Sequence, residues 1–168
     1  YFELEHRDGL AINIARIEER FKEALTMTWS GDAENDGFNR LLLGADLTAR
    51  EIVVLRAYCR YLVQTGVPFS QAYMERALAA NPAIAAGLVR LFEARLDPAA
   101  QPAAGRRGRA PGAASRRDPS AEIAAQIRAS LDSVASLDED RILRAYLGLV
   151  QATLRTNYWR TGIGASGT

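Results

Sequence analysis

The chain has 168 residues, of which 48% are hydrophobic and 24% charged, and its 21 Lys and Arg nearly balance its 20 Asp and Glu. These values are typical of a globular domain and exclude a chain that is disordered throughout. A single cysteine, Cys59, excludes an internal disulfide and a cysteine-based zinc site. No apolar run approaches the roughly 18 residues of a membrane-spanning helix, and the first residues lack a signal-peptide pattern. We therefore expect a cytoplasmic protein that makes no membrane contact.

The first forty residues carry the pattern of two helices. Five apolar residues recur at spacings of three and four, which predicts one face of an amphipathic helix: Leu10, Ile14, Ile17, Phe21 and Leu25. This helix should end at Ser30 and Gly31. A short helix over about residues 36–43 should follow, with Asp36 placed to pair with Arg40.

Three further helices are marked by their start and stop signals. The start signals are Thr48 with Glu51, which form a capping box, then Ser70, and then Asn81 with Pro82. The stop signals are Gly66, the end of the apolar pattern near Ala80, and Asp97 with Pro98. Apolar residues at helical spacing should face inward: Ile52, Leu55, Cys59, Leu62, Ile84, Leu88, Leu91, Phe92 and Leu96.

Residues 98–119 differ in composition from everything around them. They contain only Pro, Ala, Gly, Ser, Arg, Gln and Asp, and five arginines against one aspartate give them a net charge of +4. The whole chain is +1, so the remainder is −3. We interpret this stretch as a flexible basic linker, because it offers nothing large and apolar to bury. Arginines can bind phosphates, but the stretch has no aromatic residue for base stacking, so nucleic-acid binding is the weaker interpretation.

Two helices are expected after the linker. Asp118 and Pro119 start the first, and a second capping box at Ser136 and Glu139 starts the last. The last helix has the widest apolar face: Ile142, Leu143, Tyr146, Leu147, Leu149, Val150 and Leu154. Such a face is either sandwiched between neighbouring helices or lies against something absent from this chain. The predicted fold is all-α, an irregular bundle of about seven helices.

Each candidate for chemistry lacks something that the chemistry requires. The stretch 162–167 matches the G-x-G-x-x-G pattern of dinucleotide sites, but a helix precedes it where a strand is needed, so 160–168 is expected to be a disordered tail. The stretch 32–37 resembles the start of a calcium loop, but its twelfth position is Leu43 instead of glutamate. His6 has no orienting partner nearby in the sequence.

The charged residues at the start of the last helix also have a structural explanation. Acidic side chains at a helix start complement its dipole, and Asp140 with Arg144 forms an i,i+4 pair. An interdomain contact is the alternative for this cluster: Asp138, Glu139, Asp140, Arg141 and Arg144. We assign no catalytic, cofactor-binding or metal-binding residue to this chain.

Four blocks of sequence resemble the large bacterial NAD-specific glutamate dehydrogenases. They are GDAENDGFNRL (31–41), LRAYCRYLVQTGVPFSQAY (55–73), LFEARLDP (91–98) and VASLDEDRILR (134–144), which runs on to QATLRTNY (151–158). The blocks stand in the family's order and cover about residues 1–97 and 120–159. Residues 98–119 match nothing in the pattern, and residues 160–168 do not resemble the family's continuation.

The resemblance implies a function that the residues alone do not. Members of the family convert L-glutamate, NAD and water to 2-oxoglutarate, ammonium and NADH. The chain is similar to the helical region just before the catalytic domain. It would link regulatory and catalytic regions that are missing here, would itself be inactive, and would bind no cofactor, although the parent enzyme uses NAD and is expected to be a homo-oligomer.

The resemblance also divides the chain. Residues 1–8 would be the trailing extended segment of an ACT-like regulatory domain, and 9–97 and 120–159 would be helical segments on either side of the linker at 98–119. The alternative is a stand-alone helical protein-interaction module. A fragment should keep an exposed apolar surface on its last helix, whereas a stand-alone module should have a closed core and a basic loop that orders on binding.

Overall fold

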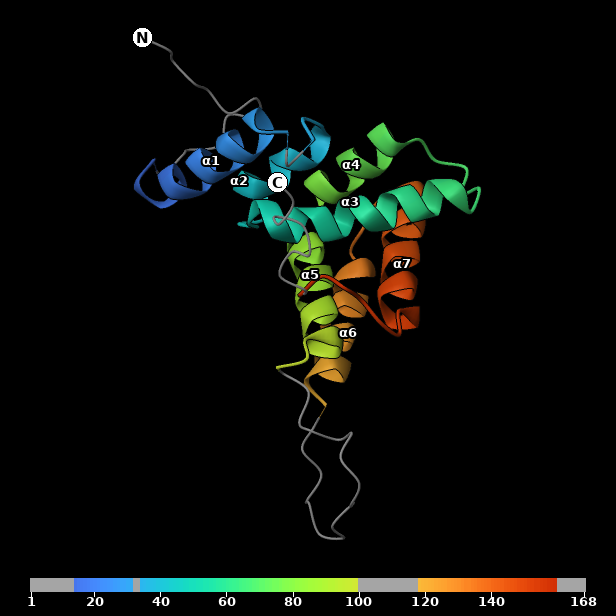
Figure 1. Cartoon of the computed structure of the whole chain (residues 1–168). Coiled ribbons are helices and arrows are strands. Elements are labelled where there is room, and N and C mark those ends of the chain that lie inside the picture. Colours follow the sequence, from blue (N-terminus) through green and yellow to red (C-terminus); the bar gives the residue numbers. More distant parts are fainter. Residues whose placement is uncertain (1–13, 32–33, 100–117, 160–168) are drawn as a thin grey trace, which may run out of the picture.

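The computed structural model describes residues 14–31, 34–99 and 118–159 (Figure 1). Within these ranges the fold is all-α, as predicted, with seven α-helices and one 3₁₀ turn. The expected extended segment at 1–8 and most of the expected linker lie outside the described residues. The elements are α1 Ile14–Trp29, η1 Gly37–Asn39, α2 Arg40–Gly44, α3 Ala49–Gln64, α4 Gln71–Ala80, α5 Pro82–Leu96, α6 Pro119–Leu131 and α7 Leu137–Ala152.

The predicted caps account for most helix starts. Thr48 and Glu51 form the complete capping box of α3: the Thr48 hydroxyl accepts from the Glu51 amide and the Glu51 carboxylate accepts from the Thr48 amide. Ser70 caps α4 and Asp118 caps α6 in the same way with their side-chain oxygens. Gly66 follows the end of α3 with φ of +79°, a conformation that glycine adopts without strain.

Two predicted caps differ in detail. Ser136 accepts from the Glu139 amide, but the Glu139 carboxylate accepts instead from the side-chain amide of Asn81, on another helix. Asn81 precedes the first-turn proline of α5 without capping it, because its amide donates to the Ala77 carbonyl and to Glu139. Asn81 and Glu139 thus contribute a contact between two helices where the sequence predicted two local caps.

The short helix predicted over about 36–43 begins differently. Residues 37–39 form the 3₁₀ turn η1 and the α-helix starts only at Arg40. The prediction that Asp36 pairs with Arg40 is wrong. Asp36 caps η1 by accepting from the Phe38 amide, and both of its oxygens accept from the guanidinium of Arg56 on α3. The buried long-range partner replaces the local one.

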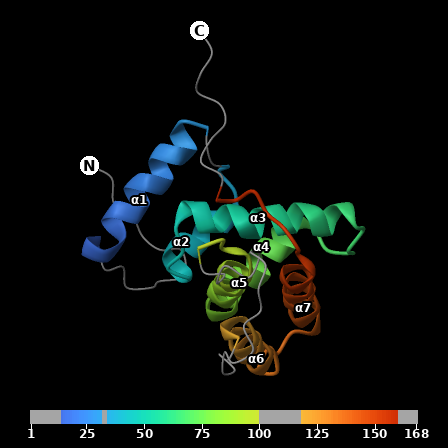
Figure 2. The ribbon, with the colours of Figure 1, turned by 60° about the horizontal axis from the view of Figure 1, so that its bottom comes forward.

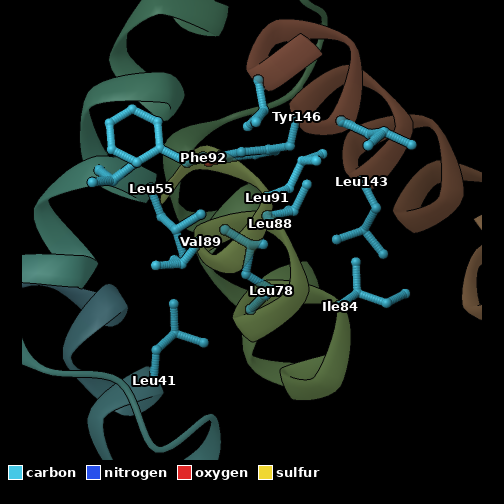
Figure 3. Close-up of a cluster of buried hydrophobic side chains, with 14 of the residues drawn as sticks. Leu41, Leu55, Leu78, Ile84, Leu88, Val89, Leu91, Phe92, Leu143 and Tyr146 are labelled. Atoms are coloured by element: carbon cyan, nitrogen blue, oxygen red, sulfur yellow. The ribbon is translucent and has the colours of Figure 1, made fainter. Parts of the chain in front are cut away.

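The helices pack around one hydrophobic core. Figure 1 shows α3 lying across one end of the group formed by α5, α6 and α7, with α4 behind it, and Figure 2 shows the same group from another side. Figure 3 shows the middle of this core, where Leu88 and Leu91 of α5 meet Leu143 and Tyr146 of α7. These four side chains are at most 1% exposed. All nine residues predicted to face inward on α3 and α5 are buried.

The wide apolar face of α7 is sandwiched between neighbours, the first of the two alternatives. Five of its side chains are buried against α3, α4, α5 and α6: Ile142, Leu143, Tyr146, Leu147 and Val150. Leu149 is half-buried, and Leu154 lies beyond the helix end and is exposed. The expected unfilled apolar surface on the last helix is therefore not found.

No single described helix is both long and apolar enough to cross a membrane. Helices α4 and α5 reach the required length and composition only when taken together, across a bend of 100°. Their apolar side chains form the middle of the core, among them Met74 and Leu78 of α4 and Leu88 of α5, all fully buried. Their apolar composition is therefore explained by the core.

We expect Thr48→Ala to lower the free energy of unfolding by ~1 kcal/mol, because an amide at the start of α3 loses its acceptor. Ser136→Ala should cost a similar amount for α7. Thermal or urea unfolding of each variant measures the loss. Unchanged unfolding in both variants would mean that the two caps do not hold these helix starts.

Candidate functional site

An exposed apolar stripe lies on α1. Phe21, Leu25 and Trp29 follow one another at spacings of four residues, and 40%, 55% and 90% of each residue is exposed. In Figure 2, α1 stands away from the bundle that the other helices form. Trp29 was missed in the sequence, although its spacing from Leu25 continues the predicted pattern. The sequence predicted an unpartnered apolar surface on the last helix, so an exposed stripe on α1 was not expected.

A second exposed apolar surface lies on the outer face of α3. Val53 and Tyr61 are 38% and 52% exposed, and they border an open groove of about 400 Å³. The segment that follows α7 forms the other wall and passes across α3 in Figure 2. The groove is lined by Val53, Val54, Ala57, Tyr58, Tyr61, Phe92, Thr153, Arg155, Thr156, Asn157 and Tyr158.

Aromatic rings hold the outer wall of this groove in place. The ring centroid of Phe92 is 5.4 Å from that of Tyr158, edge to face, and 5.4 Å from that of Trp159, stacked. The Arg50 guanidinium lies 4.8 Å from the Tyr158 ring centroid and donates to the Tyr158 carbonyl at 2.8 Å. The segment after α7 is therefore packed against the bundle as far as residue 159.

Glu93 lies behind this wall in an unfavourable electrostatic position. Burial raises the pKa of its carboxyl, and the negative charges of Glu51 and Asp97 raise it further. A carboxyl with a raised pKa in the folded state is most compatible with folding when it is protonated. The contribution of Glu93 to the free energy of unfolding is therefore favourable at low pH, and it is lost as the pH rises through the folded-state pKa of this carboxyl.

We accordingly expect Glu93→Gln to be more stable than the parent chain at neutral pH. The advantage should vanish below the ordinary glutamate pKa of about 4.3, where the parent residue is also neutral. Thermal unfolding of both chains across this pH range tests the expectation. A variant that is less stable than the parent at neutral pH would show that the Glu93 charge is stabilised in the fold.

The acidic turn before η1 makes structural contacts with α3 in the part of it that the structure describes. Arg56 on α3 is only 5% exposed, and its guanidinium donates to both carboxylate oxygens of Asp36, at 2.7 and 2.9 Å, and to the side chain of Asn39. Arg60, on the same helix, forms an exposed ion pair with Glu34. The turn is thus bound to α3, and the Asp36 oxygens are already engaged. The sequence signal for this contact was an arginine next to the inward face of α3.

Cys59 is buried, as predicted, and its neighbour is Tyr146. The Tyr146 hydroxyl is also buried and has no hydrogen-bond partner of ordinary geometry. The Cys59 thiol lies beside it. Burial raises the pKa of both groups, and each therefore stays protonated. A buried, protonated thiol is not a nucleophile.

The charged residues at the start of α7 pair locally, except for Glu139. Arg144 donates to both oxygens of Asp140, as predicted, and also reaches Asp132 at 3.3 Å. Arg141 lies 3.8 Å from Asp138, and Glu139 accepts from Asn81. These pairs are mostly exposed and so contribute little stability. Contacts within the chain thus explain each charged residue of this cluster.

Four of the described helix starts use their backbone amides within the chain itself. Pyrophosphate groups bind at helix starts whose backbone amides are free to donate. The starts of α3, α4, α6 and α7 are instead occupied by their own side-chain oxygens, those of Thr48, Ser70, Asp118 and Ser136. The described ranges also contain no group of three His, Cys, Asp or Glu side chains that could hold a metal ion. His6, the glycine pattern at 162–167 and the five arginines of the basic stretch lie outside them.

Two family models match the chain, one on each side of the basic stretch. Residues 33–98 match helical motif 3 of glutamate dehydrogenase. Residues 126–167 match the catalytic domain of bacterial NAD-glutamate dehydrogenase. The chain is therefore homologous to bacterial glutamate dehydrogenases, which confirms the resemblance seen in its sequence blocks.

Individual relatives agree with this assignment. The chain is 42% identical over 159 residues to the NAD-specific glutamate dehydrogenase of Halomonas elongata and 47% identical over 152 residues to that of Mycobacterium tuberculosis. It is 42% identical over 159 residues to that of Pseudomonas aeruginosa. These alignments cover 90–95% of the chain but only 9% of each relative. No solved structure matches the chain.

The second match reaches further than expected from the sequence. Residues 126–159 were expected to lie before the catalytic domain, and residues 160–168 were expected not to resemble the family at all. The catalytic-domain match begins within α6, includes all of α7 and extends to residue 167. Weak similarity spread over a short stretch is detected by a family model more readily than by inspection.

Proposed function

We propose that this chain is a non-catalytic helical part of an NAD-dependent glutamate dehydrogenase and links its regulatory and catalytic regions. The longer enzyme would convert L-glutamate, NAD and water to 2-oxoglutarate, ammonium and NADH, in the cytoplasm and as a homo-oligomer. Support comes from the two family models and the named relatives.

The observation that carries the linking role is the exposed stripe of α1. A stretch of helix that exposes Phe21, Leu25 and Trp29 loses the stabilisation that apolar burial would provide. The relatives are about eleven times longer than the aligned stretch, so they hold ample chain to cover it. The stripe lies before residue 33, where the helical-motif match begins. We assign it as the surface that contacts the preceding region of the longer enzyme.

Hydrogen exchange tests this assignment. The backbone amides of residues 21–29 should exchange more slowly in the full-length enzyme than in the isolated 168-residue chain, because a covering domain suppresses local opening. Residues 84–92 of α5, buried in the core of the chain itself, are the internal control and should exchange alike in both. Equal exchange of residues 21–29 in the two proteins would overturn the linking role.

The closed core around α7 also fits the alternative, a stand-alone helical interaction module. In that case the basic stretch would be its binding element, for a protein or, as the weaker choice, for a nucleic acid. Deleting residues 105–115 tests this. Our proposal expects the helical content and melting temperature to stay unchanged, with no binding of a DNA or RNA oligonucleotide by either chain. Oligonucleotide binding that disappears with the deletion would favour the module.

A further inference from the structure

The basic stretch separates the two family matches, and its composition is typical of a linker between domains. The helices on either side of it nevertheless pack directly against each other. Gly87 in the middle of α5 lies so close to α6 that a Cβ atom there would be 3.0 Å from Cγ1 of Ile127. Helices α5 and α6 thus lie side by side in one bundle, although residues 100–117 separate them in the sequence (Figures 1 and 2).

The two matched segments also share one core. Tyr146, Leu143 and Val150 belong to the catalytic-domain match and are fully buried. They form a single cluster with Leu88 and Leu91 of the helical-motif match, as Figure 3 shows for four of these five. Separating the segments would expose large apolar side chains on both sides, which is unfavourable in proportion to the area exposed.

Four polar contacts also join the two matched segments. The Tyr58 hydroxyl lies 2.8 Å from that of Thr153, and Arg95 donates to the Gln151 carbonyl at 2.7 Å. The other two are the contacts of Asn81 with Glu139 and of Arg50 with the Tyr158 carbonyl. In each pair the first residue lies in the helical-motif match and the second in the catalytic-domain match.

We infer that helical motif 3 and the first helices of the catalytic domain are one folding unit that moves as a rigid body, with no hinge at residues 98–119. Packed interfaces of this kind switch between discrete arrangements or stay fixed, and they do not bend continuously. A displacement of α3 would therefore be transmitted undiminished to the segment that ends at Trp159. This transmission rests on the proposed function, whereas the single folding unit does not.

A cut through the basic stretch tests the folding unit. A recognition site for a specific protease is inserted between Gly112 and Ala113 of the full chain, and the folded protein is then cleaved. We expect the two pieces to elute together from a size-exclusion column at micromolar concentration, with the helical circular dichroism of the uncut chain, and to separate in denaturant. Pieces that elute separately in native buffer overturn the inference.

Two glycine variants locate the contact that holds the pieces together. Gly87→Leu should weaken their association at least tenfold, because the side chain would collide with Ile127, although leucine favours helix more than glycine does. Gly148→Ala is the matched control, since nothing lies within 4 Å of the added Cβ and association should be unchanged. Equal association of both variants with the parent would contradict the shared interface, and so would separation caused by Gly148→Ala alone.

The cleavage result is independent of the hydrogen-exchange result. Pieces that stay together while residues 21–29 remain unprotected in the full-length enzyme would retain the folding unit and reject the linking role. Pieces that separate, while residues 21–29 become protected in the full-length enzyme, would reject the folding unit and retain the linking role.

Discussion

Arg56→Ala should lower the free energy of unfolding by about 3–5 kcal/mol, the largest loss that we expect from an ionic contact in this chain. The substitution leaves the carboxylate of Asp36, which is mostly buried, without its partner. It also removes the donor to the Asn39 side chain, so η1 loses its polar contacts with α3. Urea unfolding followed by circular dichroism measures the loss.

Arg60→Ala is the matched control for this prediction. Arg60 lies one turn further along α3 and pairs with Glu34 of the same acidic turn, but both side chains are about half exposed. Removing an exposed pair should cost at most about 1 kcal/mol. Similar losses for the two variants would show that burial does not set the strength of the Arg56 contact.

Tyr146→Ala should cost about 3–5 kcal/mol, because it removes a large and fully buried side chain from the centre of the core. Tyr146→Phe separates the two contributions of this residue. It keeps the ring and removes a buried hydroxyl that has no ordinary hydrogen-bond partner, so its stability should equal or exceed that of the parent. A loss of several kcal/mol in the phenylalanine variant would reveal a strong hydrogen bond from the hydroxyl.

Local sequence signals predicted the helices well because each signal acts within a few residues. Thr48 and Glu51 satisfy backbone groups of their own helix, and Gly66 adopts the left-handed conformation that ends it. Apolar spacing likewise identified the inward faces of α3 and α5. Both kinds of signal are independent of how the helices are arranged in space.

Contacts between distant residues were predicted less well. Asp36 has a local candidate in Arg40, and only the folded chain brings Arg56, twenty residues away, into its reach. Asn81 and Glu139 each looked like a local cap until the fold placed them together. The apolar face of α7 likewise left open whether its cover lay inside the chain. The groove beside α3 forms because the segment after α7 packs back against the bundle. The spacing of apolar residues along the sequence does not predict where that segment lies.

The basic stretch also illustrates the difference between local sequence signals and contacts between distant residues. Its composition differs from that of the segments around it, and this difference favoured a boundary between domains there. The close packing of Gly87 on Ile127 shows instead that the helices on both sides belong to one body. The composition of a segment shows that it has no large apolar side chains to bury. It does not show whether the helices on either side of that segment pack against each other.

Isothermal titration of NAD into the purified 168-residue chain, with and without L-glutamate, tests the central claim most directly. Hydride transfer requires a site that holds the nicotinamide beside acid–base groups, and we assign no such residues to this chain. We expect no saturable heat and no glutamate-dependent formation of NADH. A stoichiometric, micromolar binding signal that vanished in Gly164→Val would contradict a non-catalytic role and would make the glycine pattern at 162–167 a nucleotide site.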